Sequence, residues 1–479
     1  MEMERSMTQN ITEPQKEAEI QGEFKRNLGL FDATSIVAGC MIGCGIFIVT
    51  SETARLLDSA WLVLLVWGIV AITTTIAGLC YSEYAAAIPE AGGMYVYLKK
   101  VFGKRIGFLY GWTLFLVVQT GCIAAISVAF AKFTGVLLPH LINDTPLLSF
   151  GVLNITPISL LAMALIVLLT YVNSQGVKLG ALVQNIFTST KLIALFGLIL
   201  VGIFLRNPDV ISHNFGAFPS VELDGDFLLI LAVATVGAFF AADSWHNVTF
   251  IASEIKNPEK NLPKALAFGM GGVCIIYFIT NLIYLSVLEL SQVQNAPNDI
   301  VAASFFEVIF GPIGKMIMAV LIMISAVGSV NGTVLAGARA FWAMAKDGLF
   351  FNSLSKIDSN SGVPVNALVA QGLWSIILVL SGSFTALLVY ITFIELVFYV
   401  LTIGGLFQFR HKYPNLHRPY KTLWYPVLPI IYCIFAIFMA VALLIHRPEN
   451  TLPGLVILFT GLPVYYLKRK YTTIKGATN

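Results

Sequence analysis

The 479-residue chain has few charged residues, since Asp, Glu, Lys and Arg together make up only 11% of it. A soluble domain carries about 25% charged residues because it must solvate its surface, so a soluble globular protein is excluded. The formal net charge of +3 is also too small to indicate a nucleic acid partner.

Other functional classes lack their signatures. The chain has no G-x-x-x-x-G-K-[ST] phosphate-binding loop, so it does not hydrolyse a nucleotide itself. No spacing of His, Cys and carboxylates suggests a metal site, and no nucleophile–base pair suggests an enzyme. No cofactor is expected either. All 6 cysteines lie within apolar runs, which argues against a disulfide framework. Residues 1–27 have no apolar core of the kind a signal peptide needs, and we expect them to form a disordered cytoplasmic tail.

The dominant feature of the sequence is its high content of hydrophobic residues, which make up 57% of it. A helix needs about 20 mostly apolar residues to cross a bilayer. The chain therefore predicts an all-α integral membrane protein with about twelve spans. We place them at 30–55, 60–87, 106–137, 156–175, 180–205, 227–252, 265–290, 311–345, 364–381, 384–409, 422–446 and 450–467.

The distribution of Lys and Arg predicts the orientation, because short cytoplasmic loops collect these residues. With a cytoplasmic N-terminus, most of the 29 basic residues fall in inner loops. The outer loops keep Arg55, Arg206, Lys315 and Arg447. We therefore expect a multi-pass protein of the cell membrane with both termini in the cytoplasm.

Two predicted spans are interrupted at corresponding places. Span 1 contains GCMIGCGIF (Gly39–Phe47), and span 6 contains GAFFAADSW (Gly237–Trp245). Each glycine in a helix interior costs about 1 kcal/mol relative to alanine, so these segments are expected to unwind. Broken helices at matching places are typical of transporters built from two inverted five-helix repeats. We assign the repeats to 28–205 and 227–409, followed by two helices in 422–467 and a cytoplasmic tail at 468–479.

The two breaks suggest the ligand. Free backbone N–H groups beside the positive end of a half-helix in span 1 suit a carboxylate, although tight packing of small residues is the alternative. Carbonyl oxygens freed in span 6 suit an ammonium group, while Asp243 can serve as a helix cap. A site with both kinds of receptor describes an amino acid.

Three other ionisable residues within the predicted spans are candidates for a functional role. Lys191 is near the middle of span 5 and needs buried partners, unless its side chain extends to the membrane interface. Glu395 lies deep in span 10, and its partner is not identifiable from the sequence. His246 follows the span 6 break and is either a structural residue or a pH switch.

Longer motifs extend this reading. They are CYSEYAAAIPEAGGMYVYLKKVFG after span 2, FLYGWTLFLVVQTGCIAAISVAFAKF in span 3, FFAADSWHNVTFIASEIKNPEKNLPKAL through span 6 and GSVNGTVLAGARAFWAMAKDG in span 8. With them, residues 28 to about 410 resemble the amino acid–polyamine–organocation (APC) superfamily, and within it the L-type amino acid transporter family. The resemblance implies the five-plus-five inverted repeat with two additional helices.

The resemblance also implies roles for individual residues. In span 1 it implies a substrate-binding segment formed by Met41, Gly43, Cys44 and Gly45, with the Met41 carbonyl and the Cys44 and Gly45 amides facing the substrate. In span 6 it implies carbonyl ligands from Phe240, Ala241 and Asp243, with the Phe240 ring as a gate. Lys191 would take the place of a sodium ion and touch span 1 near Gly43 and span 8 near Ser329.

The chain departs from the family pattern in three places. Cys44 stands where a serine is usual, and AADSWH stands where AYDGWN is common, which affects side-chain specificity. The segment LPHLINDTPLLSFGVLNITP lacks the cysteine that joins animal relatives to a heavy subunit, so no covalent partner is expected.

The sequence thus predicts a sodium-independent secondary carrier of neutral L-amino acids, acting as an exchanger or a proton-coupled symporter. A carrier of cationic amino acids or polyamines and a non-transporting amino acid sensor are the alternatives.

Overall fold

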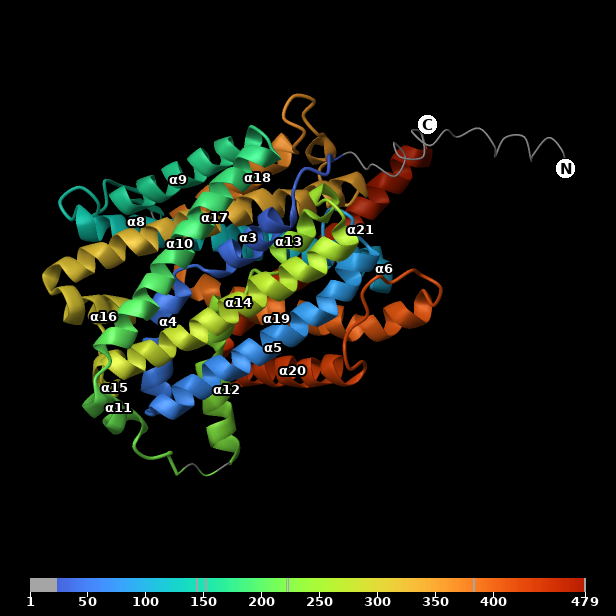
Figure 1. Cartoon of the computed structure of the whole chain (residues 1–479). Helices are drawn as coiled ribbons and strands as arrows, with labels where there is room; N and C mark the ends of the chain where they lie inside the picture. Colours follow the sequence, from blue (N-terminus) through green and yellow to red (C-terminus); the bar gives the residue numbers. More distant parts are fainter. Residues whose placement is uncertain are drawn as a thin grey trace.

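The computed structural model describes residues 24–143, 145–150, 153–220, 222, 224–381 and 384–477, and nearly all of its regular structure is helical (Figure 1). The first elements are α3 (Leu30–Met41), α4 (Gly45–Leu57), α5 (Ala60–Ala87), α6 (Met94–Phe102), α7 (Lys104–Thr113), the π-helical turn η1 (Leu114–Val118), α8 (Gln119–Leu137), α9 (Pro157–Ser174), α10 (Val177–Leu205) and α11 (Pro208–Phe215). Between α8 and α9, strands β1 (Leu148–Phe150) and β2 (Leu153–Ile155) form a short antiparallel hairpin.

The later elements are likewise helical. They are α12 (Gly225–Ala241), α13 (Asn247–Phe250), η2 (Ala252–Glu254), α14 (Pro258–Val287), α15 (Leu290–Gln294), η3 (Pro297–Asp299), α16 (Val301–Phe310), α17 (Pro312–Lys346), η4 (Asn352–Ser355), α18 (Val365–Leu380), α19 (Phe384–Lys412), α20 (Val427–His446) and α21 (Pro448–Ala477).

Among the described residues, ten helical segments are long and apolar enough to cross a membrane. They are Leu30–Leu57, Ala60–Ala87, Lys104–Leu137, Pro157–Ser174, Val177–Leu205, Pro258–Val287, Pro312–Lys346, Tyr390–Lys412, Val427–His446 and Thr451–Lys468. The other two predicted spans, 227–252 and 364–381, correspond to the shorter apolar helices α12 and α18. The all-helical membrane architecture is confirmed, whereas the count of twelve crossings and the inverted symmetry stay predictions.

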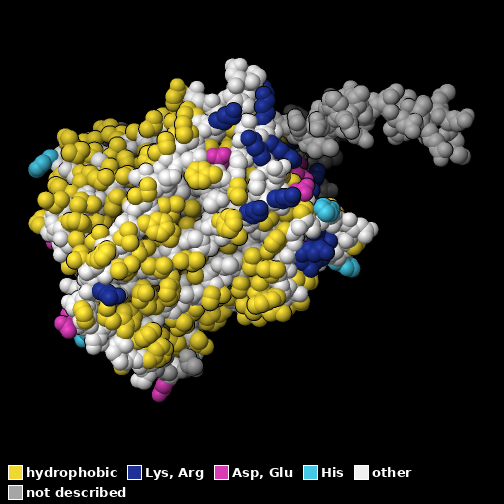
Figure 2. Space-filling view, viewed as in Figure 1, with side chains coloured by type: hydrophobic (Ala, Val, Ile, Leu, Met, Phe, Trp, Pro, Cys, Tyr) yellow, Lys and Arg dark blue, Asp and Glu magenta, His cyan; other side chains and the backbone are white. Residues whose placement is uncertain are grey.

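Helix α10 illustrates how the spans pack. Large apolar side chains such as Ile193 and Phe204 are exposed on its outer side, as expected for contact with lipid. Its polar side chains Gln184, Thr188 and Lys191 follow one another at steps of four and three residues, so they share the opposite, buried side. Figure 2 shows the same apolar covering over most of the visible surface.

Most of the Lys and Arg side chains visible in Figure 2 lie at one end of the bundle. The segment leading into α3 and the end of α21 both lie at this basic end (Figure 1). Residues 1–23 of the predicted tail lie outside the described residues. Residues 24–27 do not form a free tail, because Phe24 is buried against Trp342 with ring centroids 4.7 Å apart.

Helix α21 continues through most of the predicted tail at 468–479, and residues 478–479 lie outside the described part of the chain. At the end of the bundle opposite the basic end, the short helices α11, α15 and α16 connect the spans (Figure 1).

Candidate functional site

Span 1 is broken where the glycine-rich motif predicted it. Helix α3 ends at Met41 and α4 begins at Gly45, so Ile42, Gly43 and Cys44 lie between the two helices. The Gly43 N–H closes the turn by donating to the Met41 carbonyl at 2.8 Å. The N–H groups of Cys44 and Gly45 stand at the start of α4, where a helix supplies no acceptor and its dipole is positive.

Span 6 is broken at the predicted place as well. Helix α12 ends at Ala241, α13 begins at Asn247, and Ser244 adopts a left-handed conformation with φ 67°. The Phe240 carbonyl is already engaged, because the Asp243 N–H donates to it at 3.2 Å. Among the described residues, no backbone N–H outside the helices donates to the carbonyl oxygens of Ala241 and Asp243. Of the three carbonyl groups predicted to bind the substrate, those of Ala241 and Asp243 are therefore the ones free to accept a hydrogen bond from it.

The two breaks touch each other through Gly45 and Ala241. A Cβ atom on Gly45 would lie 2.6 Å from the Ala241 Cβ and 3.0 Å from its Cα. Contacts that short are not tolerated, so a glycine is required at position 45 for the helices to approach. The amide groups at the start of α4 and the carbonyl groups at the end of α12 are thereby brought to one place.

Lys191 connects span 5 with the span 1 break. Its Nζ lies 2.7 Å from the Gly39 carbonyl oxygen and 2.6 Å from that of Ile42. It also lies 3.2 Å from both the Ser325 carbonyl oxygen and the Ser329 Oγ on α17. The ammonium group, on a residue that is only 2% exposed, is thus surrounded by four oxygen atoms.

Two hydroxyl groups of α17 complete this cage. Ser329 Oγ donates to the Ile42 carbonyl at 2.8 Å, and Ser325 Oγ donates to the Ile42 and Gly43 carbonyls at 2.9 and 3.1 Å. The predicted contacts of Lys191 with the span 1 break and with Ser329 are present, and its part in transport stays a prediction.

Met41 has a second role that the sequence did not reveal. The Tyr277 hydroxyl on α14 donates to the Met41 carbonyl at 2.9 Å. Together with the Gly43 N–H, this bond occupies the carbonyl that was predicted to face the substrate. The Met41 carbonyl therefore holds the break in place and is not a free acceptor for a substrate.

Phe239 and Phe240 differ in their surroundings. Phe239 is 4% exposed, and its ring lies 6.3 Å from that of Tyr399 and 6.4 Å from that of Phe435, measured between centroids. Phe240 is only partly buried at the margin of the core, which suits a side chain that can move.

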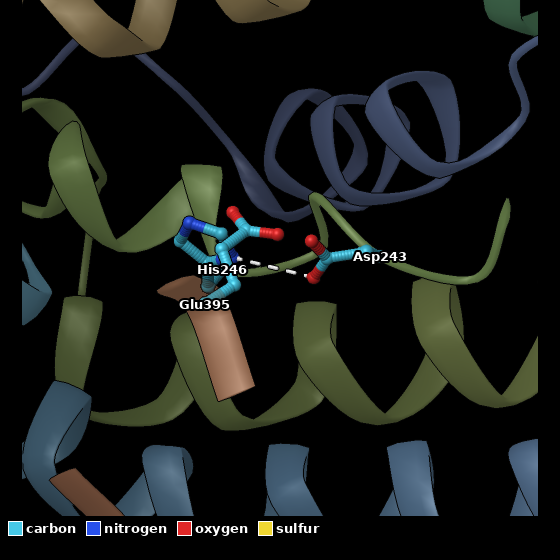
Figure 3. Close-up of side chains that lie close together, drawn as sticks. All are labelled: Asp243, His246 and Glu395. Atoms are coloured by element: carbon cyan, nitrogen blue, oxygen red, sulfur yellow. Dashed lines mark ion pairs between the residues drawn. The ribbon is translucent and has the colours of Figure 1, made fainter. Parts of the chain in front are cut away.

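A group of buried polar residues lies beside the span 6 break and was not predicted as a unit. Asp243, His246 and Glu395 bring their polar atoms within 4.8 Å of one another, with Glu395 reaching in from α19 (Figure 3). The Tyr399 hydroxyl donates to Asp243 Oδ1 at 2.5 Å and lies 2.7 Å from His246 Nδ1. The sequence signals were the location of all three residues in predicted spans and the spacing of Glu395 and Tyr399, four residues apart on one helical side.

The basic end of the bundle is closed by contacts between the segments flanking both broken spans. Leu28 and Ile255 form an isolated parallel bridge, in which the Leu28 N–H donates to the Glu254 carbonyl at 2.9 Å. The Glu254 carboxylate pairs with Arg339 of α17 at 2.7 Å, and each side chain is 1% exposed.

These features together define a class. Two interrupted helices of the membrane bundle meet at backbone groups that have no hydrogen-bond partner among the described residues. Contacts between the flanking segments close the bundle at one end. This arrangement is that of a secondary transporter. The sequence model of the family described as amino acid permease matches residues 28–466, so the chain belongs to the amino acid permease family.

Within this family, the chain is similar to several known amino acid transporters. Over 467 residues the chain is 32% identical to the large neutral amino acids transporter small subunit 2 of Mus musculus, covering 95% of this chain and 84% of that protein. It is also 32% identical over 449 residues to the Asc-type amino acid transporter 1 of Mus musculus, with 93% and 81% covered. Identity to the b(0,+)-type amino acid transporter 1 of Homo sapiens is 27% over 445 residues, with 93% and 88% covered.

Proposed function

We propose that this protein is a sodium-independent secondary carrier of neutral L-amino acids that works by alternating access, either as an exchanger or as a proton-coupled symporter. The observation that carries the proposal is the contact of Gly45 with Ala241. It brings helix-start amides and unpaired carbonyls together, and these two receptors match the carboxylate and the ammonium group of one amino acid.

The preference for neutral side chains is supported by the similarity to a transporter named for large neutral amino acids. The Asp243 carboxylate is engaged within the protein, since it accepts a hydrogen bond from the Tyr399 hydroxyl at 2.5 Å and lies 3.8 Å from His246 Nδ1. On the similarity to a transporter named for large neutral amino acids, a carrier of cationic amino acids or polyamines is the weaker candidate.

Sodium independence is supported by the oxygen cage around Lys191. Carbonyl and hydroxyl oxygens of this kind also suit a hard cation such as sodium, but here they surround an ammonium group. A second cation in the same cage would meet a like charge in a poorly screened environment.

The charge distribution supports the orientation that we propose for the protein in the membrane. Lys and Arg gather at the end of the bundle where α21 ends, and this supports a cell-membrane protein with both termini in the cytoplasm. One relative is named a small subunit. All six cysteines here are free and belong to helices or their caps, which supports a carrier without a covalently attached heavy subunit.

The experiment is uptake of labelled L-leucine into proteoliposomes. We expect faster uptake when unlabelled leucine is inside, equal rates in sodium and choline buffers, and weak competition by L-lysine and diamines. A steep sodium dependence, or a preference for a diamine, would overturn the proposal.

A further inference from the structure

Asp243, His246 and Glu395 are buried, with 5%, 2% and 5% of their surfaces exposed, beside the proposed ammonium site. Asp243 and His246 flank the turn between α12 and α13, whereas Glu395 belongs to α19 (Figure 3). The group therefore connects the break in span 6 with α19, a helix that contributes no residue to the oxygen cage around Lys191. Neither the proposed substrate contacts nor that cage accounts for it.

The charge of this group is not balanced by a basic side chain. Among the described residues, the ion pair of Asp243 is with His246, at 3.8 Å, and neither acid pairs with a lysine or an arginine. Among the described residues, the other titratable groups that interact electrostatically with the two acids include Tyr110 of α7, Cys122 of α8, Tyr399 of α19 and Tyr432 of α20. The Tyr81 ring of α5 lies 5.9 Å from that of Tyr399. Two buried carboxylates this close repel each other strongly, so the three residues must hold at least one proton between them.

A second observation points to a mobile ligand at the same place. The hydroxyl groups of Tyr110 and Tyr432 are buried and have no hydrogen-bond partner among the described residues. Tyr432 packs beside Tyr399, with ring centroids 6.4 Å apart, and the Tyr110 ring lies 5.1 Å from that of Phe398 on α19. Buried hydroxyls are normally hydrogen-bonded, so two unpartnered hydroxyls on the helices around the acids suit a site that exchanges protons with water during the cycle.

We propose that Asp243, Glu395 and His246 form a proton-binding site, and that one proton moves with each amino acid in the same direction. The inference rests on the proposed transport function and deepens it by naming the coupling ion. The proton enters from solvent onto one of the two carboxyl groups or the imidazole and leaves to solvent on the other side of the membrane, with no other bond made or broken.

The coupling follows from where the three residues are attached. Without the proton, repulsion between Asp243 and Glu395 pushes the span 6 break away from α19. With the proton, the Tyr399 bridge to Asp243 and His246 can hold the break closed over the substrate. Proton and amino acid then favour the same closed state, which makes their binding mutually supportive.

The test is uptake of labelled L-leucine into proteoliposomes with a pH gradient of one unit, acid outside, and with the membrane potential clamped by potassium and valinomycin. One proton per substrate limits accumulation to about tenfold per pH unit, and we expect the purified protein to approach this ratio. In Glu395→Gln and Asp243→Asn the pair no longer needs a shared proton, so uptake with and without the gradient should be equal. Because the readout is a ratio within each variant, it does not depend on how much activity the variant retains.

A matched pair of buried tyrosines controls for lost packing. Tyr432→Phe should shift the pH dependence of uptake, because Tyr432 packs beside Tyr399. Tyr284→Phe should not, because the Tyr284 hydroxyl is also buried and unpartnered but its ring packs against Phe305, away from the acids. If the unmodified protein exchanges leucine at equal pH but ignores the gradient, or if Glu395→Gln keeps the response, the proton site is wrong and the carrier remains. If it does not exchange leucine at all, the proposed function itself fails.

Discussion

The ammonium nitrogen of Lys191 lies 2.6 Å from the carbonyl oxygen of Ile42, although 149 residues separate the two in the chain. Ile42 directly follows α3, the first half of span 1, and its carbonyl would have no helical partner in the break. The lysine therefore stabilises the unwound backbone from behind the proposed substrate site.

Replacing Lys191 by alanine should abolish most transport while substrate binding is less affected. The change removes the charged donor from the Gly39 and Ile42 carbonyl oxygens and from the Ser329 hydroxyl, at a cost on the order of 1–3 kcal/mol. Uptake in proteoliposomes and ligand-induced thermal stabilisation in detergent measure the two effects separately. Lys132→Ala, which changes an exposed lysine on α8, is the control and should transport normally. Normal transport by Lys191→Ala would refute this role.

Replacing Gly45 by alanine should reduce uptake at least tenfold, because the added methyl group would lie 2.6 Å from the Ala241 Cβ. The helices must then separate, at a typical overpacking cost of about 1–3 kcal/mol, and the amide and carbonyl receptors move apart. Gly271→Ala on α14 is the matched control, since a Cβ there meets nothing within 4 Å. Equal uptake by the two variants would mean that the breaks need not meet.

Phe240→Ala should slow turnover strongly at nearly unchanged thermal stability, as expected for a side chain that covers the bound substrate. Phe239→Ala should instead lower the stability of the fold by about 3–5 kcal/mol, because this ring is buried against Tyr399 and Phe435. Uptake per folded molecule, measured beside melting in detergent, separates the two outcomes. Normal turnover of Phe240→Ala would show that the gate is elsewhere.

Glu254→Gln should destabilise the closed basic end of the bundle. Removing one partner leaves the Arg339 guanidinium charged and buried, which typically costs about 3–5 kcal/mol. The control is Glu307→Gln, whose pair with Lys315 is 3.0 Å long and roughly half exposed, and which should cost less than about 1 kcal/mol. Equal melting temperatures for the two variants in detergent would contradict the importance of the buried pair.

The positions of both breaks were predictable from the sequence, because clusters of small residues and an Asp within apolar spans are local signals. The partners of Lys191 came from the family resemblance rather than from any local pattern. The engaged state of the Met41 carbonyl could not be predicted, since its donor Tyr277 is 236 residues away in the chain.

The group formed by Asp243, His246 and Glu395 was missed for the same physical reason. Each residue taken alone has an ordinary structural explanation, and only the packing of α19 against the α12–α13 turn makes them one group. The short helices α11, α15 and α16 were also missed, because they are too brief to carry the apolar pattern of a span.

The most direct test of the account is a competition series in proteoliposomes that exchange labelled L-leucine. The competitors are leucine, its decarboxylated amine and its N-acetyl derivative, which share a side chain and differ only in the groups that the two breaks would bind. If amides at Cys44 and Gly45 hold the carboxylate and carbonyls at Ala241 and Asp243 hold the ammonium group, each loss removes charge-assisted hydrogen bonds worth about 1.5–3 kcal/mol. We therefore expect both analogues to compete at least tenfold more weakly than leucine, whereas equal or stronger competition by the decarboxylated amine would contradict the account.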